Sequence, residues 1–263
     1  MNLFKSIKKY DIIQGDKFKL IADDFLDEEK QYISLVNKPK LIFCKTDYLP
    51  AFEKKILPKI NYKFTIISHN SDIPVDQRHL NILNNNNLVK WYGMNCHIEH
   101  NKLTPIPIGI ANEKWPHGKK DILEEVANEK ISKKNRVYCN FNPNTNIIRY
   151  NILENLKKYD FIDFEKNNLD YKSYLRKLSS YKYVISPPGN SIDCHRIWES
   201  IYLRTLPIVH KDNALLTFNQ LPIIFIESWE NLDLSFFDNF SLLNKNLDFS
   251  NFTYLENLIK CGK

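Results

Sequence analysis

Short apolar runs alternate along this chain with polar segments that have helical spacing. A short apolar run bounded by polar or turn residues is typical of a buried strand. Such runs stand at residues 40–44, 64–67, 88–91 and 103–110, and again at 136–141, 161–164, 183–186, 206–209 and 223–226. Helical patterns follow at 147–156, 170–181 and 193–203, and Asn142-Pro143-Asn144 predicts a turn. Strands that alternate with helices predict βα units and a largely parallel sheet.

The runs form two series, separated by a charged, helix-prone segment at residues 119–134. This segment shows no clear apolar face, so we expect it to act as a connector. The pattern therefore predicts an α/β protein in which two Rossmann-like domains face one cleft. We expect the first domain at residues 1–115 and the second at residues 116–263.

Hydrophobic residues make up 43% of the 263 residues, which is enough for a sizeable core. No uninterrupted apolar stretch approaches the roughly 18 to 20 residues of a membrane span. Residues 1–15 lack the apolar run and the small-residue cleavage site of a signal peptide. We therefore expect a cytoplasmic protein that has no transmembrane segment. If the sequence is viral, this compartment is the cytoplasm of the host.

The net charge of +6 comes from 37 basic and 31 acidic residues spread along the chain. Zinc-finger spacing, basic heptads and RNP aromatics are missing, so we expect no nucleic-acid partner. The five cysteines contain no C-x-x-C pair, and His97 and His100 form an H-x-x-H pair without the H-E-x-x-H motif. The sequence therefore predicts neither a metal site nor a cofactor.

The most informative segment is YVISPPGNSIDCHRIWESIYLRTLPIVH, at residues 183–210. A strand ends at Pro-Pro-Gly, a polar loop follows, and Asp193 is expected to cap a helix whose Trp198 and Ile201 face the core. Such a turn lies at the carboxyl end of a parallel sheet, where ligands bind. Gly189 allows close approach to the backbone, and Arg196 and Glu199 share one helix face, suited to a phosphate and to ribose hydroxyls. The alternative is a structural turn with an Arg196–Glu199 salt bridge.

The pattern Pro187-x-Gly189, Arg196-x-x-Glu199 and the strand 207–209 resembles the nucleotide-sugar-binding region of exostosin-like glycosyltransferases. The string SPPGNSIDCHRIWE is closest to versions from large DNA viruses and unicellular eukaryotes. The resemblance covers most of residues 40–230, with softer matches at SHNSD, KWYGMN and PIPIGIAN. The family usually has a glycine just before the Pro-Ile strand, where this chain has Arg204.

The resemblance implies a GT-B fold, with the acceptor bound mainly by the first domain and a nucleotide-sugar mainly by the second. It also implies chemistry without a divalent metal, in agreement with the absence of a D-x-D triplet. Basic side chains must then offset the charge of the leaving diphosphate. Arg149, early in its helix, is a candidate, and the alternative for it is a solvent-facing position. The expected donor-binding residues are Arg149, Ser186, Gly189, Asn190, Asp193, Arg196 and Glu199.

An inverting transfer needs a base that accepts the proton of the acceptor hydroxyl. His69, Asp72 and Asp47 follow predicted strands and are candidates, although Asp72 could cap the next segment and His69 could be a satisfied core histidine. The function expected is transfer of a sugar, with a UDP-sugar as the leading donor, to a hydroxyl of a glycan or glycoconjugate. The alternatives are a non-catalytic nucleotide-sugar or glycan-binding protein and, more weakly, a nucleic-acid-binding protein.

Overall fold

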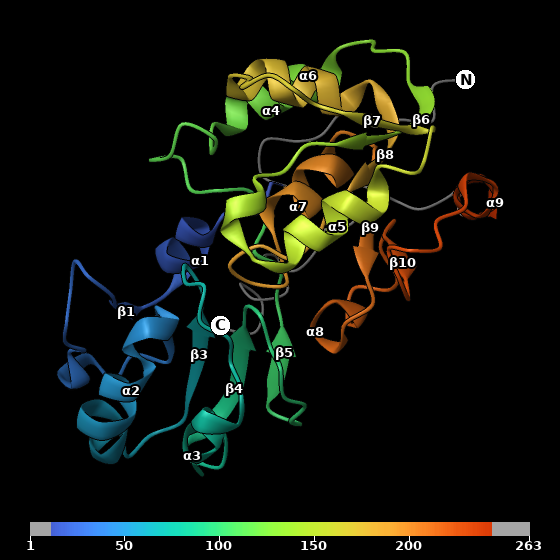
Figure 1. The fold of residues 1–263 in the computed structure, drawn as a ribbon. Helices are drawn as coiled ribbons and strands as arrows, with labels where there is room; N and C mark the ends of the chain where they lie inside the picture. The colour runs from blue at the N-terminus through green and yellow to red at the C-terminus, as the bar shows by residue number, and fades with distance from the viewer. Residues whose placement is uncertain (1–11, 244–263) are drawn as a thin grey trace. The chain divides into compact units, whose positions relative to one another are not determined.

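The computed structural model describes residues 12–243, and these divide into two compact units between Ile108 and Gly109. Of the described residues, the N-terminal unit comprises Ile13–Ile108, and the C-terminal unit comprises residues 109–243 together with Ile12. Each unit contains one parallel five-stranded sheet, so the protein is α/β, as the sequence predicts (Figure 1). The division falls a little before the domain boundary expected after residue 115. Within residues 12–243 no helix is long and apolar enough to cross a membrane.

The sheet of the N-terminal unit has its strands in sequence order, β1-β2-β3-β4-β5. The strands are β1 (Asp24–Leu26), β2 (Leu41–Cys44), β3 (Phe64–Ser68), β4 (Leu88–Gly93) and β5 (Leu103–Pro105). The helical elements are α1 (Gly15–Ile21), η1 (Leu35–Asn37), η2 (Thr46–Tyr48), α2 (Leu49–Ala51), η3 (Phe52–Ile56), η4 (Leu57–Lys59), η5 (Gln77–His79) and α3 (Leu80–Leu83). Right-handed crossovers between strands in sequence order bring their helical segments to one face of a sheet.

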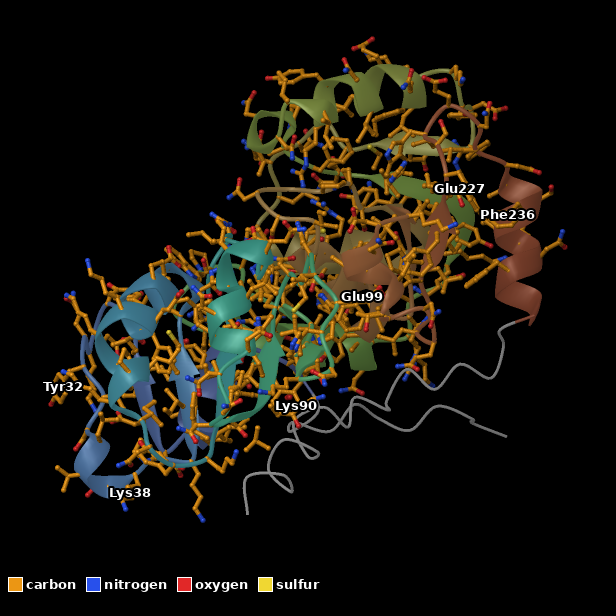
Figure 2. All side chains as sticks on the ribbon, turned by 90° about the horizontal axis from the view of Figure 1, so that it is seen from below. Tyr32, Lys38, Lys90, Glu99, Glu227 and Phe236 are labelled. Carbon is orange, nitrogen blue, oxygen red and sulfur yellow. The ribbon has the colours of Figure 1, made fainter. Side chains whose placement is uncertain are left out.

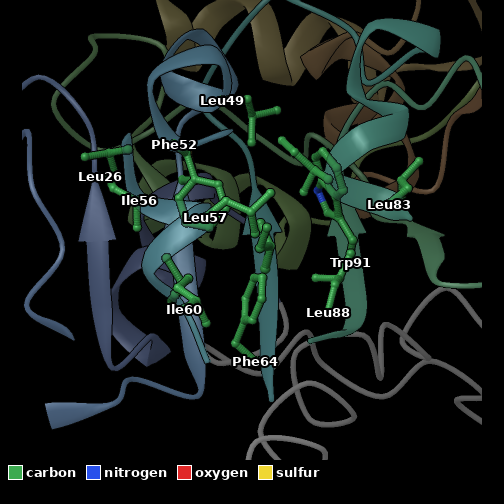
Figure 3. Close-up of a cluster of buried hydrophobic side chains, with 14 of the residues drawn as sticks. Leu26, Leu49, Phe52, Ile56, Leu57, Ile60, Phe64, Leu83, Leu88 and Trp91 are labelled. Atoms are coloured by element: carbon green, nitrogen blue, oxygen red, sulfur yellow. The ribbon is translucent and has the colours of Figure 1, made fainter. Parts of the chain in front are cut away.

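The core of the N-terminal unit lies between this face of the sheet and the helical segments (Figure 3). Ile66 of β3 and Trp91 of β4 pack there with Phe52 of η3, and all three are buried. Side chains alternate along a strand, so Phe43 and Ile67 belong to the opposite face, and they are fully buried as well. Burial of both faces is characteristic of parallel sheets.

The sheet of the C-terminal unit has the order β7-β6-β8-β9-β10, which is not the sequence order. The strands are β6 (Lys134–Cys139), β7 (Ile162–Phe164), β8 (Tyr181–Ile185), β9 (Leu206–His210) and β10 (Ile224–Ile226). The helices are α4 (Lys120–Asn128), η6 (Pro143–Thr145), α5 (Ile148–Leu156), α6 (Tyr171–Ser179), α7 (His195–Tyr202), α8 (Asn213–Leu216) and α9 (Leu234–Leu243). The chain leaves β6 toward one edge of the sheet and leaves β8 toward the other edge.

Helices cover both faces of the C-terminal sheet. Val137 of β6 and Ile185 of β8 belong to a core that also contains Ile152 of α5 and Phe237 of α9. On the other face, α6 packs against β8 and α7 packs against β9, with Trp198 fully buried. This arrangement is a doubly wound sheet with the flavodoxin-like strand order.

The prediction that residues 119–134 act as a connector is wrong. It forms α4 and the start of β6, and α4 buries Leu123 and Val126 completely beside α6 (Figure 1). These two residues are three positions apart and therefore share one helix face. The apolar stripe is narrow, and the charges around it pair with α6, as in the ion pair between Glu129 and Arg176.

Two strand predictions differ from the structure. The apolar run 103–110 forms a strand only over Leu103–Pro105, because Pro105 and Pro107 have no N–H for a sheet hydrogen bond. The strand β1 was not expected, since it spans only three residues inside an acidic stretch. Its pairing with β2, rather than its own composition, defines it.

The turn from α7 to β9 places Arg204 in the left-handed region, with φ 57°. This is the position at which the exostosin-like pattern has glycine, and the turn forms here with backbone bonds from Arg204 N to Ile201 O and from Thr205 N to Ser200 O. The charge of Arg204 adds to burial in lowering the pKa of Lys133 to about 7. Arginine in place of glycine at position 204 therefore introduces backbone strain and a charge repulsion with Lys133.

We expect Arg204→Gly to raise the free energy of unfolding by about 1 kcal/mol. Relief of left-handed strain is worth about 1–2 kcal/mol, and the added flexibility of glycine in the unfolded chain offsets about 0.5–1 kcal/mol. Urea unfolding would measure the change. Arg204→Ala is the control, because it removes the charge and keeps the strained Cβ. Equal stability of the alanine and glycine variants would contradict the strain argument.

Candidate functional site

The carboxyl ends of β6 and β8 form the topological switch point of the C-terminal sheet, where ligands bind in open parallel sheets. Two loops begin there, at residues 140–147 after β6 and at residues 186–194 after β8. The second loop and the helix α7 that follows contain most of the donor-binding residues expected from the sequence. The sheet topology therefore brings the resembling segment to the edge at which ligands are expected.

Arg149 joins the two loops. Its guanidinium donates to the carbonyl oxygens of Pro188 (Nε, 2.7 Å), Asn142 (Nη1, 2.9 Å) and Pro187 (Nη2, 3.2 Å), and it lies over the ring of Phe141. Only 5% of the residue is exposed, so the solvent-facing alternative is wrong. Burial, followed by the positive charge of Arg196, lowers the pKa of Arg149. Arg149 thus holds the shape of the Pro-Pro-Gly loop from inside.

Gly189 leaves space for this arginine. A Cβ atom at position 189 would lie 3.1 Å from Arg149 Nη2, closer than ordinary contact allows. The Gly189 carbonyl accepts a hydrogen bond of 2.8 Å from Asn146 Nδ2, which adds a second link between the loops. The close approach expected at this glycine is therefore made by an arginine of the protein itself.

Arg196, in the first turn of α7, is partly exposed, but its Nε is buried and has no hydrogen-bond partner among residues 12–243. Burial acts to lower its pKa, and the neighbouring Tyr174, Cys194 and Glu199 raise it overall. No salt bridge joins it to Glu199 among the ion pairs of the described chain, so the salt-bridged alternative is wrong. A buried, unpaired donor is costly and rare in native proteins, and a bound ligand would satisfy it.

Ser186 provides a second unpaired group at this edge. It directly follows β8, is 1% exposed, and its Oγ finds no hydrogen-bond partner within the described residues. Its backbone N–H donates to Ile208 O at 2.9 Å, so the unpaired donor of this residue is the hydroxyl. The switch point thus contains two polar atoms whose hydrogen-bonding capacity the described protein does not use.

Glu199 is 4% exposed and accepts a hydrogen bond of 2.9 Å from the hydroxyl of Tyr174 on α6. Burial raises the pKa of Glu199, and the Tyr174 hydrogen bond and the charge of Arg196 oppose this rise. The positive charges of Arg149 and Arg196 repel each other, and the carboxylate of Glu199 acts on Arg196 against this repulsion. The balance of charge favours an anion at the switch point.

We expect Glu199→Gln to flatten the pH dependence of stability. A carboxyl whose pKa is raised above its usual 4.5 binds its proton more tightly in the folded state. Its stabilising contribution is complete below pH 4.5 and is lost as pH rises through the raised pKa. Urea unfolding from pH 4 to pH 8 should therefore show wild type losing more stability than Glu199→Gln. Parallel curves for the two proteins would contradict this account.

Asp193 does not cap the helix. The N-cap of α7 is Cys194, and Asp193 Oδ1 accepts a hydrogen bond of 2.7 Å from the indole of Trp198. The indole N–H of Trp198 is a buried donor, and it binds the carboxylate that the sequence predicted to cap the helix. Trp198 and Ile201 are fully buried, as predicted, and Asn190 is exposed in the loop.

A pocket of about 530 Å³ adjoins the Pro-Pro-Gly loop within the C-terminal unit. Pro188, Ile192 and Trp229 contribute apolar surface, and the lining also includes Glu227, an exposed residue that Figure 2 labels. Most of the surface that lines the pocket is apolar, with Ile148 and Ile152 adding to it, and the other polar groups come from Asn146, Asn151, Asn155, His210, Asp212, Ser228 and Glu230. Nothing in the sequence indicated this pocket, because its walls combine the second loop with α5 and with the segments at the ends of β9 and β10.

The chain matches no protein-family model, and no curated protein matches it significantly.

The candidate bases belong to the N-terminal unit. His69 follows β3 and is 2% exposed; its Nε2 lies 3.1 Å from Pro107 O, and its Nδ1 accepts from Asn70 N at 2.8 Å. Both ring nitrogens are engaged inside the unit, which is the arrangement of a satisfied core histidine. Asp72, in the loop after β3, and Asp47, in η2 after β2, are exposed at the carboxyl edge of this sheet.

The cysteine and histidine side chains of the described part of the chain form no metal centre. Cys44, Cys96, Cys139 and Cys194 are free thiols, and Cys261 lies outside the described residues. No group of three or more histidine, cysteine, aspartate or glutamate side chains in residues 12–243 is arranged to hold a metal ion.

Sequence reasoning missed the partners that hold the expected residues in place. Tyr174 and Asn146 contact Glu199 and Gly189 from α6 and from the loop after β6. The polar cluster NFNPN at residues 140–144 signalled a loop there, but nothing in it indicated which backbone groups Arg149 and Asn146 would bind.

Proposed function

We propose that this protein is a GT-B glycosyltransferase whose C-terminal unit binds a nucleotide-sugar. It transfers the sugar, with inversion and without a divalent metal, to a hydroxyl of a glycan or glycoconjugate; a UDP-sugar is the expected donor. The observation that carries the proposal is that the exostosin-like segment lies at the switch point of a doubly wound sheet. Nucleotide phosphates bind at this position in such folds.

The charges at the switch point support binding of a diphosphate. Arg196 offers a guanidinium that makes no salt bridge within the described chain, and a guanidinium forks onto phosphate oxygens. Arg149 contributes positive charge from behind the loop, although its own donors are committed to carbonyl groups. In this role Arg196 also offsets the charge that develops on the leaving diphosphate.

The adjoining pocket supports the sugar-bearing part of the proposal. The amides of Asn151 and Asn155 can donate hydrogen bonds to hydroxyl groups or accept hydrogen bonds from them, and the carboxylate of Asp212 can accept them. Trp229 provides apolar surface. The acidic lining repels phosphate, so the diphosphate would lie toward Arg196 and the hydroxyl-bearing groups toward the pocket. Glu199 is the candidate acceptor for ribose hydroxyls.

A thermal-shift screen against UDP-, GDP- and CMP-sugars tests the proposal. A ligand that binds the native state stabilises it by RT ln(1 + [L]/Kd), about 2.7 kcal/mol at a hundredfold excess over Kd. We expect stabilisation by one nucleotide class, followed by slow hydrolysis of that donor. Binding without hydrolysis or transfer would favour the alternative of a non-catalytic binding protein. No stabilisation by any of the three classes would contradict the donor site.

We expect turnover to survive exhaustive chelation. The arginines and the start of α7 would carry the charge of the leaving group, so a divalent ion would not be required. The measurement compares donor turnover in excess EDTA with turnover in added magnesium or manganese. Loss of turnover in EDTA with recovery on adding metal would contradict the metal-independent mechanism.

A further inference from the structure

The pocket beside the Pro-Pro-Gly loop takes one of its walls from a single face of α5. Ile148, Asn151, Ile152 and Asn155 all line it. They follow one another at offsets of three, four and seven positions, which is the spacing of residues on one side of a helix. This wall therefore combines apolar surface with two amide groups. A sugar, which has both C–H surface and hydroxyl groups, matches such a wall.

The two amides are available to a ligand. The side chains of Asn151 and Asn155 make no hydrogen bond to another group of residues 12–243. Asn146, in contrast, is used within the protein, where its Nδ2 donates to Gly189 O at 2.8 Å. Asp212 is the N-cap of α8, and its Oδ1 accepts a backbone N–H at 2.8 Å, which holds the carboxylate in place at the pocket. Amides donate and accept, and a carboxylate accepts, so these groups suit hydroxyl groups.

The charged groups of the pocket are mostly acidic. Asp212, Glu227 and Glu230 belong to the lining, and no lysine or arginine among the described residues does. Two lysines lie nearby. Lys211 pairs with the Glu227 carboxylate at 2.8 Å, and Lys158 donates to the backbone oxygen of Glu230 at 2.7 Å. These lysines offset part of the negative charge, but neither of them lines the pocket.

A sugar that carries a carboxylate fits this lining poorly. An anion that leaves water needs a cationic partner, and the lining provides neither a lysine nor an arginine for it. Like charges across a binding site also weaken the binding of the wrong partner. The hydroxyl groups of an uncharged sugar need only hydrogen-bond donors and acceptors, which the lining contains. The pocket therefore distinguishes sugars by their charge.

We propose that this pocket holds the transferred sugar and that this sugar is uncharged, a hexose or an N-acetylhexosamine rather than a uronic or sialic acid. The inference rests on the proposed function and adds the class of sugar to it. The hydroxyl groups of the sugar bind Asn151, Asn155 and Asp212. The diphosphate lies toward Arg196, so that the negative charges of the donor and of the pocket are kept apart.

The test compares UDP-glucose with UDP-glucuronate, which differ only in the group at C6 of the sugar. Isothermal titration calorimetry gives the ratio of the two Kd values. The titrations are done at pH 8, because histidine is then uncharged and cannot attract the carboxylate of the sugar. We expect wild type to bind UDP-glucose at least about 10-fold more tightly than UDP-glucuronate. If the thermal-shift screen selects GDP-sugars, GDP-mannose and GDP-mannuronate replace this pair.

Two lysine variants test whether the pocket causes the difference. Asn151→Lys places a cation in the lining and should lower the ratio of the two Kd values at least about fivefold. Ile147→Lys is the matched control, because it adds the same charge at the start of α5, at a residue that is 80% exposed and outside the lining. Its ratio should stay within about twofold of the wild-type ratio. Melting temperatures close to that of wild type would show that both variants are folded.

Equal affinity of wild type for the two donors would overturn the inference, and so would equal ratios in Asn151→Lys and Ile147→Lys. Selective stabilisation by CMP-sialate in the thermal-shift screen would also overturn it, because that sugar carries a carboxylate. In each of these cases a nucleotide-sugar binds and the proposed function stands. Failure of wild type to bind any nucleotide-sugar is a separate result, because it would remove the proposed function itself.

Discussion

Arg149→Met should lower the free energy of unfolding by about 3–5 kcal/mol, the largest stability effect expected from one substitution at the site. Arg149 donates to three backbone carbonyls, and its loss leaves Pro187, Pro188 and Asn142 without these bonds, of which the first is buried and the other two are partly buried. Hydrogen bonds from a charged donor contribute about 1.5–3 kcal/mol each, and the three are not fully additive. Urea unfolding monitored by circular dichroism would measure the loss.

Arg136→Met is the matched control. Arg136 is an arginine of the same unit, but 40% of its side chain is exposed and it pairs with Asp163 at the surface. Such pairs contribute about 0–1 kcal/mol. If Arg149→Met were no less stable than Arg136→Met, the account of Arg149 as the link between the two loops would fail.

Arg196→Met should weaken donor binding at least 30-fold and change the free energy of unfolding by less than about 1 kcal/mol. Loss of a charged group that contacts a phosphate costs about 2–5 kcal/mol of binding, and each 1.4 kcal/mol is tenfold in Kd. The folded protein loses little, because Arg196 Nε has no partner within residues 12–243 and no salt bridge there is broken. Isothermal titration calorimetry with the donor selected by the thermal-shift screen would measure Kd.

Arg196→Lys separates the effect of the positive charge from the effect of the planar guanidinium. A lysine keeps the positive charge but not the planar pair of N–H groups, so its affinity should stay well below that of wild type. Wild-type affinity in Arg196→Met would exclude Arg196 from the donor site. We therefore expect the two arginines to differ. Substitution of Arg149 lowers the free energy of unfolding, and substitution of Arg196 weakens donor binding.

The sequence alone predicts much of the fold, because buried parallel strands correspond to short apolar runs in the sequence. Each of the nine expected runs overlaps a strand of the structure, and the loop at residues 186–194 lies at the carboxyl edge of the sheet as expected. The strand β1 could not be found in this way, since Asp24–Leu26 is too short to form a pattern. The buried face of α4 was hidden because its fully buried residues are few among many charges.

The site residues were easier to locate than to interpret. Arg196 and Glu199 follow from the spacing on one helix, but the role of Arg149 depends on carbonyl groups whose directions no sequence pattern specifies. Asp193 was expected to cap the helix, but its carboxylate accepts a hydrogen bond from the indole of Trp198 instead. The hydrogen bond from Asn146 to the Gly189 carbonyl joins residues far apart in the chain, so only the three-dimensional structure reveals it.

The central claim is that a nucleotide-sugar binds at the switch point of the C-terminal unit. Hydrogen–deuterium exchange, with and without the donor that stabilises the protein most, locates the bound ligand directly. The account predicts slower exchange in peptides that cover residues 140–149 and 186–196, the two loops that meet at this edge. Slower exchange confined to residues 13–108, with both loops unchanged, would contradict it.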